Sequence, residues 1–188
     1  SKDEGLFLRY RESQKKEIQD MQLALRHLVG TKQELSGMLM NTRQSILTRH
    51  NRVQLLLNGE EKFPEVLKAL QTAKHHIHIE YYIFTDDEIG NEVVRILLEK
   101  LKEGVEVRVV YDDLGSNHIG VIPDVLREHG AEVYTFAPVL LNLYVNANYR
   151  NHRKIIVVDC KIGFVGGINL DDRYLNNGKH KLFWRDTH

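Results

Sequence analysis

The stretch from Asn151 to Asn169, NHRKIIVVDCKIGFVGGIN, places a histidine and a lysine two residues apart at the head of an apolar run. A carboxylate ends the run, and a glycine pair and an asparagine follow it. The isoleucine and valine of the run predict a buried β-strand. Because side chains two apart on a strand lie on the same face, His152 and Lys154 are predicted to point the same way.

The second half of this stretch predicts the returning strand of a hairpin. With a two-residue turn at the tip, Asp159 pairs with Ile162, and residues that lie opposite each other project on the same side of a sheet. Continuing that ladder brings together an imidazole, an ammonium and a carboxamide, those of His152, Lys154 and Asn169. Gly166 and Gly167 leave space beside them. The convergence depends on the turn length, because a change of one residue shifts every pair.

Such a space suits a phosphate group. Lys154 supplies a positive charge, Asn169 supplies N–H donors, and an uncharged imidazole on His152 supplies a nucleophile or a base. Asp159 alternates to the opposite face, where we expect it to fix the turn or to cap a neighbour. A plain buried hairpin with a solvated polar end is the alternative, but the spacing His-x-Lys, four residues, Asp, six residues, Gly-Gly-x-Asn is too long and chemically coherent to favour it.

The composition limits the classes of protein. The chain has 188 residues with 26 basic and 26 acidic side chains, so no positive field directs it to nucleic acid. Its single cysteine excludes an internal disulfide and a multi-thiolate zinc site. No run of about 18 apolar residues is present, so no membrane-spanning helix is predicted and this segment is expected to be soluble. The chain begins at Ser1 and stops at LFWRDTH, which resembles the opening of an edge strand, so we expect a segment of a longer protein.

Two regions differ in their pattern. Residues 1–50 are polar with helical spacing, and Gly30 and Gly37 interrupt them, which predicts an N-terminal segment of helical pieces. A small basic cluster there is either a solvated helix face, which we favour, or a contact with lipid headgroups: Arg9, Arg11, Lys15 and Lys16. Residues 51–188 form the second region.

Strands and helices alternate in residues 51–188, which predicts an α/β sandwich with a mixed, mostly parallel sheet flanked by helices and an antiparallel pair at its end. Apart from the hairpin, strands are predicted at 53–57, 75–84, 105–113 and 131–136. Helices are predicted at 61–73, 88–104 and 120–130. The first of them has Pro64 in its opening turn, where the missing N–H costs nothing.

The hairpin stretch strongly resembles the signature of the phospholipase D superfamily. Within that superfamily, the chain is similar to the bacterial cardiolipin synthase family through NGEEKFPEVLKALQTAKHHIHIEYYIFTDDEIG, YDDLGS, NYRNHRKI, FVGGINL and WRDTH. These motifs run in order from about Arg52 to the end, whereas residues 1–50 carry none of them. Cys160 stands at the turn tip, where the family usually has glycine, and this departure should leave the chemistry unchanged.

The resemblance implies a phospholipase D-like fold and phosphodiester exchange through a covalent phosphohistidine, without a metal or another cofactor. Two copies of the signature would meet and build one site. His152 would attack the phosphorus of phosphatidylglycerol. The histidine of the other copy would protonate the departing glycerol and then deprotonate a second phosphatidylglycerol, which yields cardiolipin.

The resemblance also implies a set of site residues. The catalytic residues would be His152, Lys154, Asp159, Asn169 and Asp186. Lys154 and Asn169 would hold the nonbridging oxygens of the phosphate, and Gly166 and Gly167 would line the substrate. Asp186, in WRDTH, would fix the second nitrogen of the imidazole, in preference to Asp171 or Asp172.

One copy of the signature is present, because KHK at Lys179–Lys181 has no strand, carboxylate or glycine pair behind it. We therefore expect residues 51–188 to be a first catalytic half, incomplete at its C-terminus. The second half would lie in the same longer chain, or in another copy within a homodimer. The expected partners are phosphatidylglycerol and the surface of the bacterial cell membrane, where the longer protein would reside.

The strand at 75–84 offers a further group of polar residues. His76, His78 and Glu80 share one face and could bind a metal by residue type, but histidines at strand ends often only form hydrogen bonds. We therefore expect no metal site. Glu80 is a candidate buried acid near the site, with a substrate-binding or supporting role.

Two other segments each allow two interpretations of their role. The apolar patch at 139–145 is either core or a docking surface for acyl chains and the bilayer. YDDLGS either rims the site through Asp113 and Ser116 or forms a plain turn.

Two other functions compete with lipid transfer. One is a phospholipase D-type phosphodiesterase or nuclease that works as a homodimer, although a nuclease would require a basic face. The other is a non-catalytic lipid-binding module. That module would have no need of the full catalytic set, yet the residues required for chemistry are all present: His152, Lys154, Asn169 and Asp186.

Overall fold

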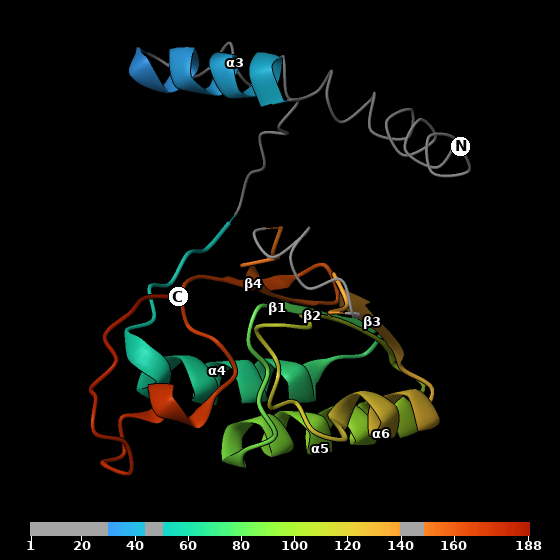
Figure 1. Ribbon diagram of the computed structural model, residues 1–188. Coiled ribbons are helices and arrows are strands. Elements are labelled where there is room, and N and C mark those ends of the chain that lie inside the picture. Colours follow the sequence, from blue (N-terminus) through green and yellow to red (C-terminus); the bar gives the residue numbers. More distant parts are fainter. Residues whose placement is uncertain (1–29, 44–50, 140–148) are drawn as a thin grey trace. The chain divides into compact units, whose positions relative to one another are not determined.

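The computed structural model describes residues 30–43, 51–139 and 149–188 (Figure 1). The chain divides into two compact units, Ser1–Gln54 and Leu55–His188. The first contains helix α3 (Thr31–Arg43). The other helical pieces predicted for residues 1–50, and their basic cluster, lie outside the described residues. In the described ranges, no helix has the length and hydrophobicity needed to cross a membrane.

The second unit alternates helices with the strands of a five-stranded sheet. Its elements are α4 (Asn58–Thr72), β1 (His76–Tyr81), α5 (Glu88–Lys102), β2 (Glu106–Asp112), α6 (Ile122–Glu128), β3 (Glu132–Phe136), β4 (Lys154–Val158), β5 (Ile162–Val165) and the 3₁₀ helix η1 (Asp172–Leu175). The strand order is β3-β2-β1-β4-β5. β1, β2 and β3 are parallel, whereas β4 is antiparallel to β1 and to β5. The predicted α/β class, with a mixed, mostly parallel sheet flanked by helices, is confirmed.

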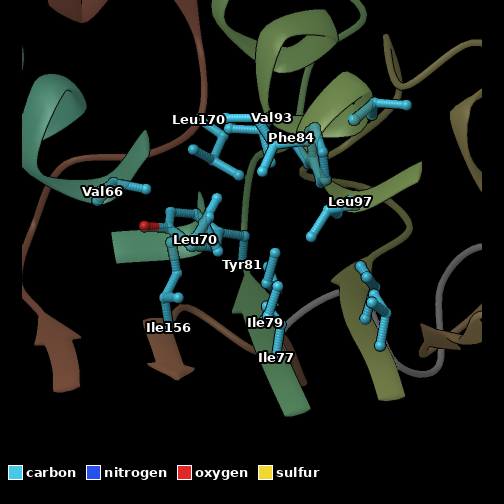
Figure 2. Close-up of a cluster of buried hydrophobic side chains, with 14 of the residues drawn as sticks. Val66, Leu70, Ile77, Ile79, Tyr81, Phe84, Val93, Leu97, Ile156 and Leu170 are labelled. Atoms are coloured by element: carbon cyan, nitrogen blue, oxygen red, sulfur yellow. The ribbon is translucent and has the colours of Figure 1, made fainter. Parts of the chain in front are cut away.

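The core lies between the sheet and helices α4, α5 and α6, which cover one of its faces (Figure 1). In β1 every second residue from Ile77 to Tyr81 is buried, whereas His78 and Glu80 on the other face are half-buried. Figure 2 shows the buried row of β1 beside side chains of the helices, among them Val66, Leu70, Val93 and Leu97. Burying each such side chain contributes about 1.5–3 kcal/mol, so the alternation fixes which face of β1 meets the helices.

The chain before α4 is not the predicted strand. Residues 53–57 belong to no strand, and their last two members form a short antiparallel contact with Thr187 and His188. This segment therefore pairs with the C-terminal residues and not with a strand of the sheet.

Helix α4 begins earlier than predicted. It starts at Asn58, and the carboxylate of Glu61 accepts the N–H of Leu57 at 2.7 Å, which closes a turn at the start of the helix. Pro64 therefore lies inside the helix rather than in its opening turn, and it removes the hydrogen bond to the carbonyl of Glu60. Pro64 is exposed, so water is available to that carbonyl.

The C-terminal LFWRDTH is not an open edge strand either. Its last residues are bonded on two sides: Leu56 exchanges hydrogen bonds of 3.0 and 2.9 Å with His188, and the N–H of Gly167 donates to the carbonyl of Thr187 at 3.0 Å. Segments from far along the chain thus occupy both flanks of residues 186–188. The edge strands of the sheet are β3 and β5.

Candidate active site

The predicted hairpin is present as β4 and β5, but its register differs by one residue. Ile162 pairs with Val158 and not with Asp159, so the loop holds three residues instead of two. Asp159 and Cys160 adopt positive φ angles of 53° and 52°. Glycine adopts this left-handed conformation most easily, so the backbone at Cys160 is in a conformation that a side chain disfavours.

The predicted route by which Asn169 reaches Lys154 is therefore wrong. β5 ends at Val165, before the ladder could place Gly167 opposite Lys154. The chain leaves the sheet there, and Leu170 returns beside Phe84 in an isolated parallel bridge. Asn169 reaches the end of β1 through this second contact and not through the hairpin.

Asn169 is fixed at both ends of its buried carboxamide. Its Oδ1 accepts the N–H of Ile83 at 3.2 Å, and its Nδ2 donates to the hydroxyl of Tyr174 at 2.8 Å. Ile83 follows Tyr82, whose ring lies beside both His152 and Lys154. The structure therefore places Asn169 at the same end of the sheet as the histidine–lysine pair.

His152 and Lys154 are in direct contact. Lys154 opposes Tyr81 in the ladder, so its side chain lies on the face that the helices cover, and it is buried. Its Nζ donates to the carbonyl of His152 at 2.8 Å and lies 2.9 Å from the imidazole Nδ1. The ring of Tyr82 stacks against the imidazole, with centroids 4.4 Å apart, and lies under the ammonium at 5.1 Å. The prediction that both side chains share one direction is confirmed.

The electrostatics keep the imidazole neutral. Burial first, and then the charge of Lys154, lower the pKa of His152 below its usual value, while Asp112 acts in the opposite direction. The neutral imidazole is the form that can act as a nucleophile. Burial also lowers the pKa of Lys154 to about 8, against the effect of Asp186, so the ammonium is still largely charged at neutral pH.

Asp186 is held beside this pair by the start of helix α4. Its N–H donates to the side chain of Asn58 at 3.1 Å, and its carbonyl accepts the N–H of Asn58 at 2.8 Å. The carboxylate lies against Gly167, where a side chain would collide with it. Its charge raises the pKa of Lys154. A side chain on Gly166 would likewise collide with His188. The two glycines therefore leave the space that the C-terminal segment occupies.

Within the described residues, no hydrogen bond joins Asp186 to His152. The Asp186 carboxylate accepts the N–H of Thr187 at 2.7 Å. The two alternatives are engaged elsewhere: Asp171 pairs with Arg173 at 2.7 Å, and Asp172 caps the first N–H groups of α5.

Asp159 lies outside this cluster. Its carboxylate accepts the N–H groups of Lys74, His75 and His76 at 2.8–2.9 Å, and these bonds lower its pKa to about 2. It sits at the opposite end of β4 from Lys154, about 15 Å along the strand. It caps the start of β1, one of the two structural roles predicted for it, and no hydrogen bond joins its side chain to His152 or Lys154 among the described residues.

Glu80 also lies apart from Lys154. It opposes Ile155 in the ladder, on the face of the sheet away from the helices. It accepts a hydrogen bond of 2.6 Å from the side chain of Asn151 and lies 3.4 Å from Arg153, the two neighbours of His152 in sequence. Its contacts therefore support the chain around His152 and do not place it in the space beside the ammonium.

The other polar residues of β1 do not converge. His78 lies 3.4 Å from Glu106, and His76 lies 3.4 Å from the sulfur of Cys160. In the part of the chain that the structure describes, no three His, Cys, Asp or Glu side chains are arranged to hold a metal ion.

YDDLGS forms a turn whose side chains bind backbone. Asp112 is fully buried and accepts the N–H groups of Asn151 and Gly115 at 3.0 Å each. Ser116 bridges the carbonyl of Tyr82 and the N–H of Phe84. Asp113, the other predicted rim residue, accepts the N–H of Val139. The rest of the apolar patch at 139–145 lies outside the described residues.

Sequence reasoning missed two residues of the site. Tyr82 carries no motif that would single it out. Lys62 did carry a signal, because it occupies the helical stripe of Val66 and Ala69, where an apolar residue is expected. Its Nζ donates to the carbonyls of Ile168 and Asn169.

Comparison with known proteins identifies the family. Residues 66–184 match the family model described as "Cardiolipin synthase, PLD-like domain". The cardiolipin synthase of Halalkalibacterium halodurans is 50% identical over 139 residues, and that of Geobacillus kaustophilus is 48% identical over 140 residues. These matches cover 72% and 73% of this chain but 27% and 28% of the relatives. The chain therefore spans about a quarter of the length of the curated relatives it matches.

Solved structures with the same fold include Nuc of Salmonella typhimurium, a phospholipase D family member, with a TM-score of 0.55 and 20% identity over 72% of this chain and 79% of that one. Another is the phosphatidylserine synthase of Haemophilus influenzae, with a TM-score of 0.53 and 15% identity over 71% of this chain and 33% of that one. At such identities the likeness is one of fold alone. Together with the sequence match over residues 66–184, it shows that the chain belongs to the cardiolipin synthase family of phospholipase D-like domains.

Proposed function

We propose that residues 51–188 are one catalytic half of a cardiolipin synthase that joins two phosphatidylglycerol molecules through a phosphohistidine at His152. The observation that carries this proposal is the contact between the imidazole of His152 and the buried ammonium of Lys154, 2.9 Å apart, at the head of β4. The lowered pKa of His152 favours the uncharged imidazole. An uncharged nucleophile beside a fixed cation is the arrangement that attack on a phosphodiester anion requires.

The reaction has two steps in this proposal. A ring nitrogen of His152 attacks phosphorus, an N–P bond forms, and the P–O bond to glycerol breaks while a partner acid protonates the departing oxygen. The hydroxyl of a second phosphatidylglycerol then attacks phosphorus, the N–P bond breaks, and the partner takes the hydroxyl proton. One cardiolipin and one glycerol result.

Two other side chains stabilise the charge on phosphorus in this scheme. Lys154 turns from the imidazole to a nonbridging oxygen. Asn169 donates one N–H to Tyr174 and keeps its second N–H for the phosphate. Removing one such donor from an enzyme typically costs about 100- to 1,000-fold in rate.

The partner acid comes from a second copy of the signature in this proposal. The relatives are longer than this chain, and the sequence holds one signature. We place the second signature in the same longer polypeptide, or in a second copy of this chain. Phosphatidylglycerol resides in the bilayer, so the assembled protein would work at the bacterial cell membrane.

The direct test is a transfer assay with the full-length protein and vesicles of labelled phosphatidylglycerol, with and without a strong chelator. We expect cardiolipin and glycerol in equal amounts, with a rate changed less than about twofold by chelation, because Lys154 and Asn169 already supply the charge and donors of a divalent ion. Phosphatidic acid as the main product would point to a phospholipase D. Activity that returns only with added zinc or manganese would contradict the metal-free site.

Asp186→Asn is expected to slow transfer in the same assay by about 100- to 10,000-fold. Once a phosphate draws Lys154 away, the imidazole nitrogen that faced the ammonium needs an acceptor, and Asp186 is the carboxylate beside that ammonium. A matched control is Asp124→Asn, at an exposed ion pair on α6. A rate for Asp186→Asn within a few-fold of wild type would transfer the orienting role to Asp112, whose charge acts on His152.

A further inference from the structure

Lys62 is a fully buried lysine in the first half of helix α4. Its Nζ donates to the carbonyl of Ile168 at 2.9 Å and to that of Asn169 at 3.2 Å. These two residues end the Gly-Gly-x-Asn part of the signature, more than 100 positions along the chain. Lys62 therefore ties the α4 scaffold to the backbone of the residue that is proposed to hold a phosphate oxygen.

Lys62 sits in a buried, largely apolar site. Its Nζ lies 4.8 Å from the centroids of the Phe63 and Tyr81 rings. Burial and then the charge of Lys154 lower the pKa of Lys62 well below its usual value, while Asp186 acts in the opposite direction. Among the described residues, no carboxylate lies within ion-pair distance of Nζ. Burying a cation is costly, so its retention on an otherwise apolar stripe calls for a reason.

We propose that Lys62 is a positioning residue for phosphoryl transfer, which fixes the Ile168–Asn169 backbone. This inference rests on the proposed function. The same helix holds Asp186 through Asn58, so α4 sets both the donor amide and the carboxylate relative to the histidine–lysine pair. The charge that develops on the phosphate in the transition state then meets an amide donor that is already held in place.

A purely structural contact is the alternative, and the kinetic constants separate the two. A contact that serves only folding stability leaves the kcat and the phosphate affinity of the folded variant unchanged. A positioning residue changes both, because Asn169 then presents its amide to the phosphate less accurately.

The test compares Lys62→Met with Lys100→Met in the full-length protein. Lys100 is another buried lysine, in the last turn of α5, where it pairs with Glu103 at 2.8 Å, beyond the opposite end of the parallel strands from the site. For Lys62→Met we expect kcat to fall about 30- to 100-fold, with KM within about threefold of wild type. We expect the inhibition constant for inorganic phosphate to rise about tenfold. Lys100→Met should leave all three quantities unchanged.

The inference is overturned if Lys62→Met folds and its kcat and phosphate affinity match those of wild type. Should the methionine variant not fold, Lys62→Gln keeps an N–H donor on a shorter side chain, and the same fall in kcat and in phosphate affinity is expected at smaller size. A wild-type protein that binds phosphate but makes no cardiolipin contradicts the proposed function instead. In that case phosphate affinity in the Lys62 variants still decides the role of this residue.

Discussion

His152→Ala in the full-length protein is expected to abolish lipid transfer. Without the imidazole no N–P bond forms, and loss of a nucleophile typically costs on the order of 10,000-fold or more. A wild-type reaction with labelled phosphatidylglycerol, quenched during turnover, should yield an acid-labile, alkali-stable phosphohistidine. Mass spectrometry should place the label on His152, and the alanine variant should show no label at that position.

His129→Ala provides the matched control, because His129 is an exposed histidine at the end of α6 that contacts a backbone carbonyl. It should retain the wild-type rate. Normal turnover by His152→Ala would remove His152 from the chemistry, and a stable label on another residue of this chain would name a different nucleophile.

The strands and helices of the second unit were predictable where the local pattern is strong. Residues 75–84 alternate apolar with polar side chains, and β1 buries one of the two rows as that alternation requires. The hairpin was also predictable, but its register was not. The three-residue turn has positive φ angles at Asp159 and Cys160. A glycine at either position would have indicated such a conformation in the sequence, but neither residue is a glycine.

The candidate site was predictable only in its local part. His152 lies two residues before the start of β4 at Lys154, so the contact between the two side chains is local in the chain. The remaining contacts join positions far apart: Lys62 with Asn169, and Asn58 with Asp186. Such pairings follow from how α4 packs under the end of the sheet, and spacing along the chain does not reveal them.

The route of Asn169 illustrates the same limit. The predicted two-residue turn would have placed Asn169 opposite His152. The observed strand pairing does not extend that far, yet the carboxamide of Asn169 lies at the end of β1. The bridge between Phe84 and Leu170 provides the alternative path. Asn169 thus lies at the end of the sheet where it was predicted, although the register that predicted it is wrong.

The 188-residue chain alone is expected to be inactive as a monomer. Its sequence holds one His-x-Lys signature, which carries the proposed nucleophile, and no second signature whose histidine would protonate the departing glycerol. Expelling an alkoxide without a general acid is slow, and the missing acid typically costs about 100- to 10,000-fold. Sedimentation of the isolated chain, combined with the lipid-transfer assay on each species, measures this directly.

Any activity of the isolated chain should therefore appear only in an associated species and rise with the square of the chain concentration. The C-terminal residues that were expected to offer an open edge are bonded on both flanks, so association must use another surface. β5 is an edge strand with Val165 largely exposed, and Val165→Lys should weaken pairing through that edge. Full activity in a species shown to be monomeric would place both the nucleophile and the acid within this chain. The second histidine would then have to be sought among its own residues, and the two-signature mechanism would be wrong.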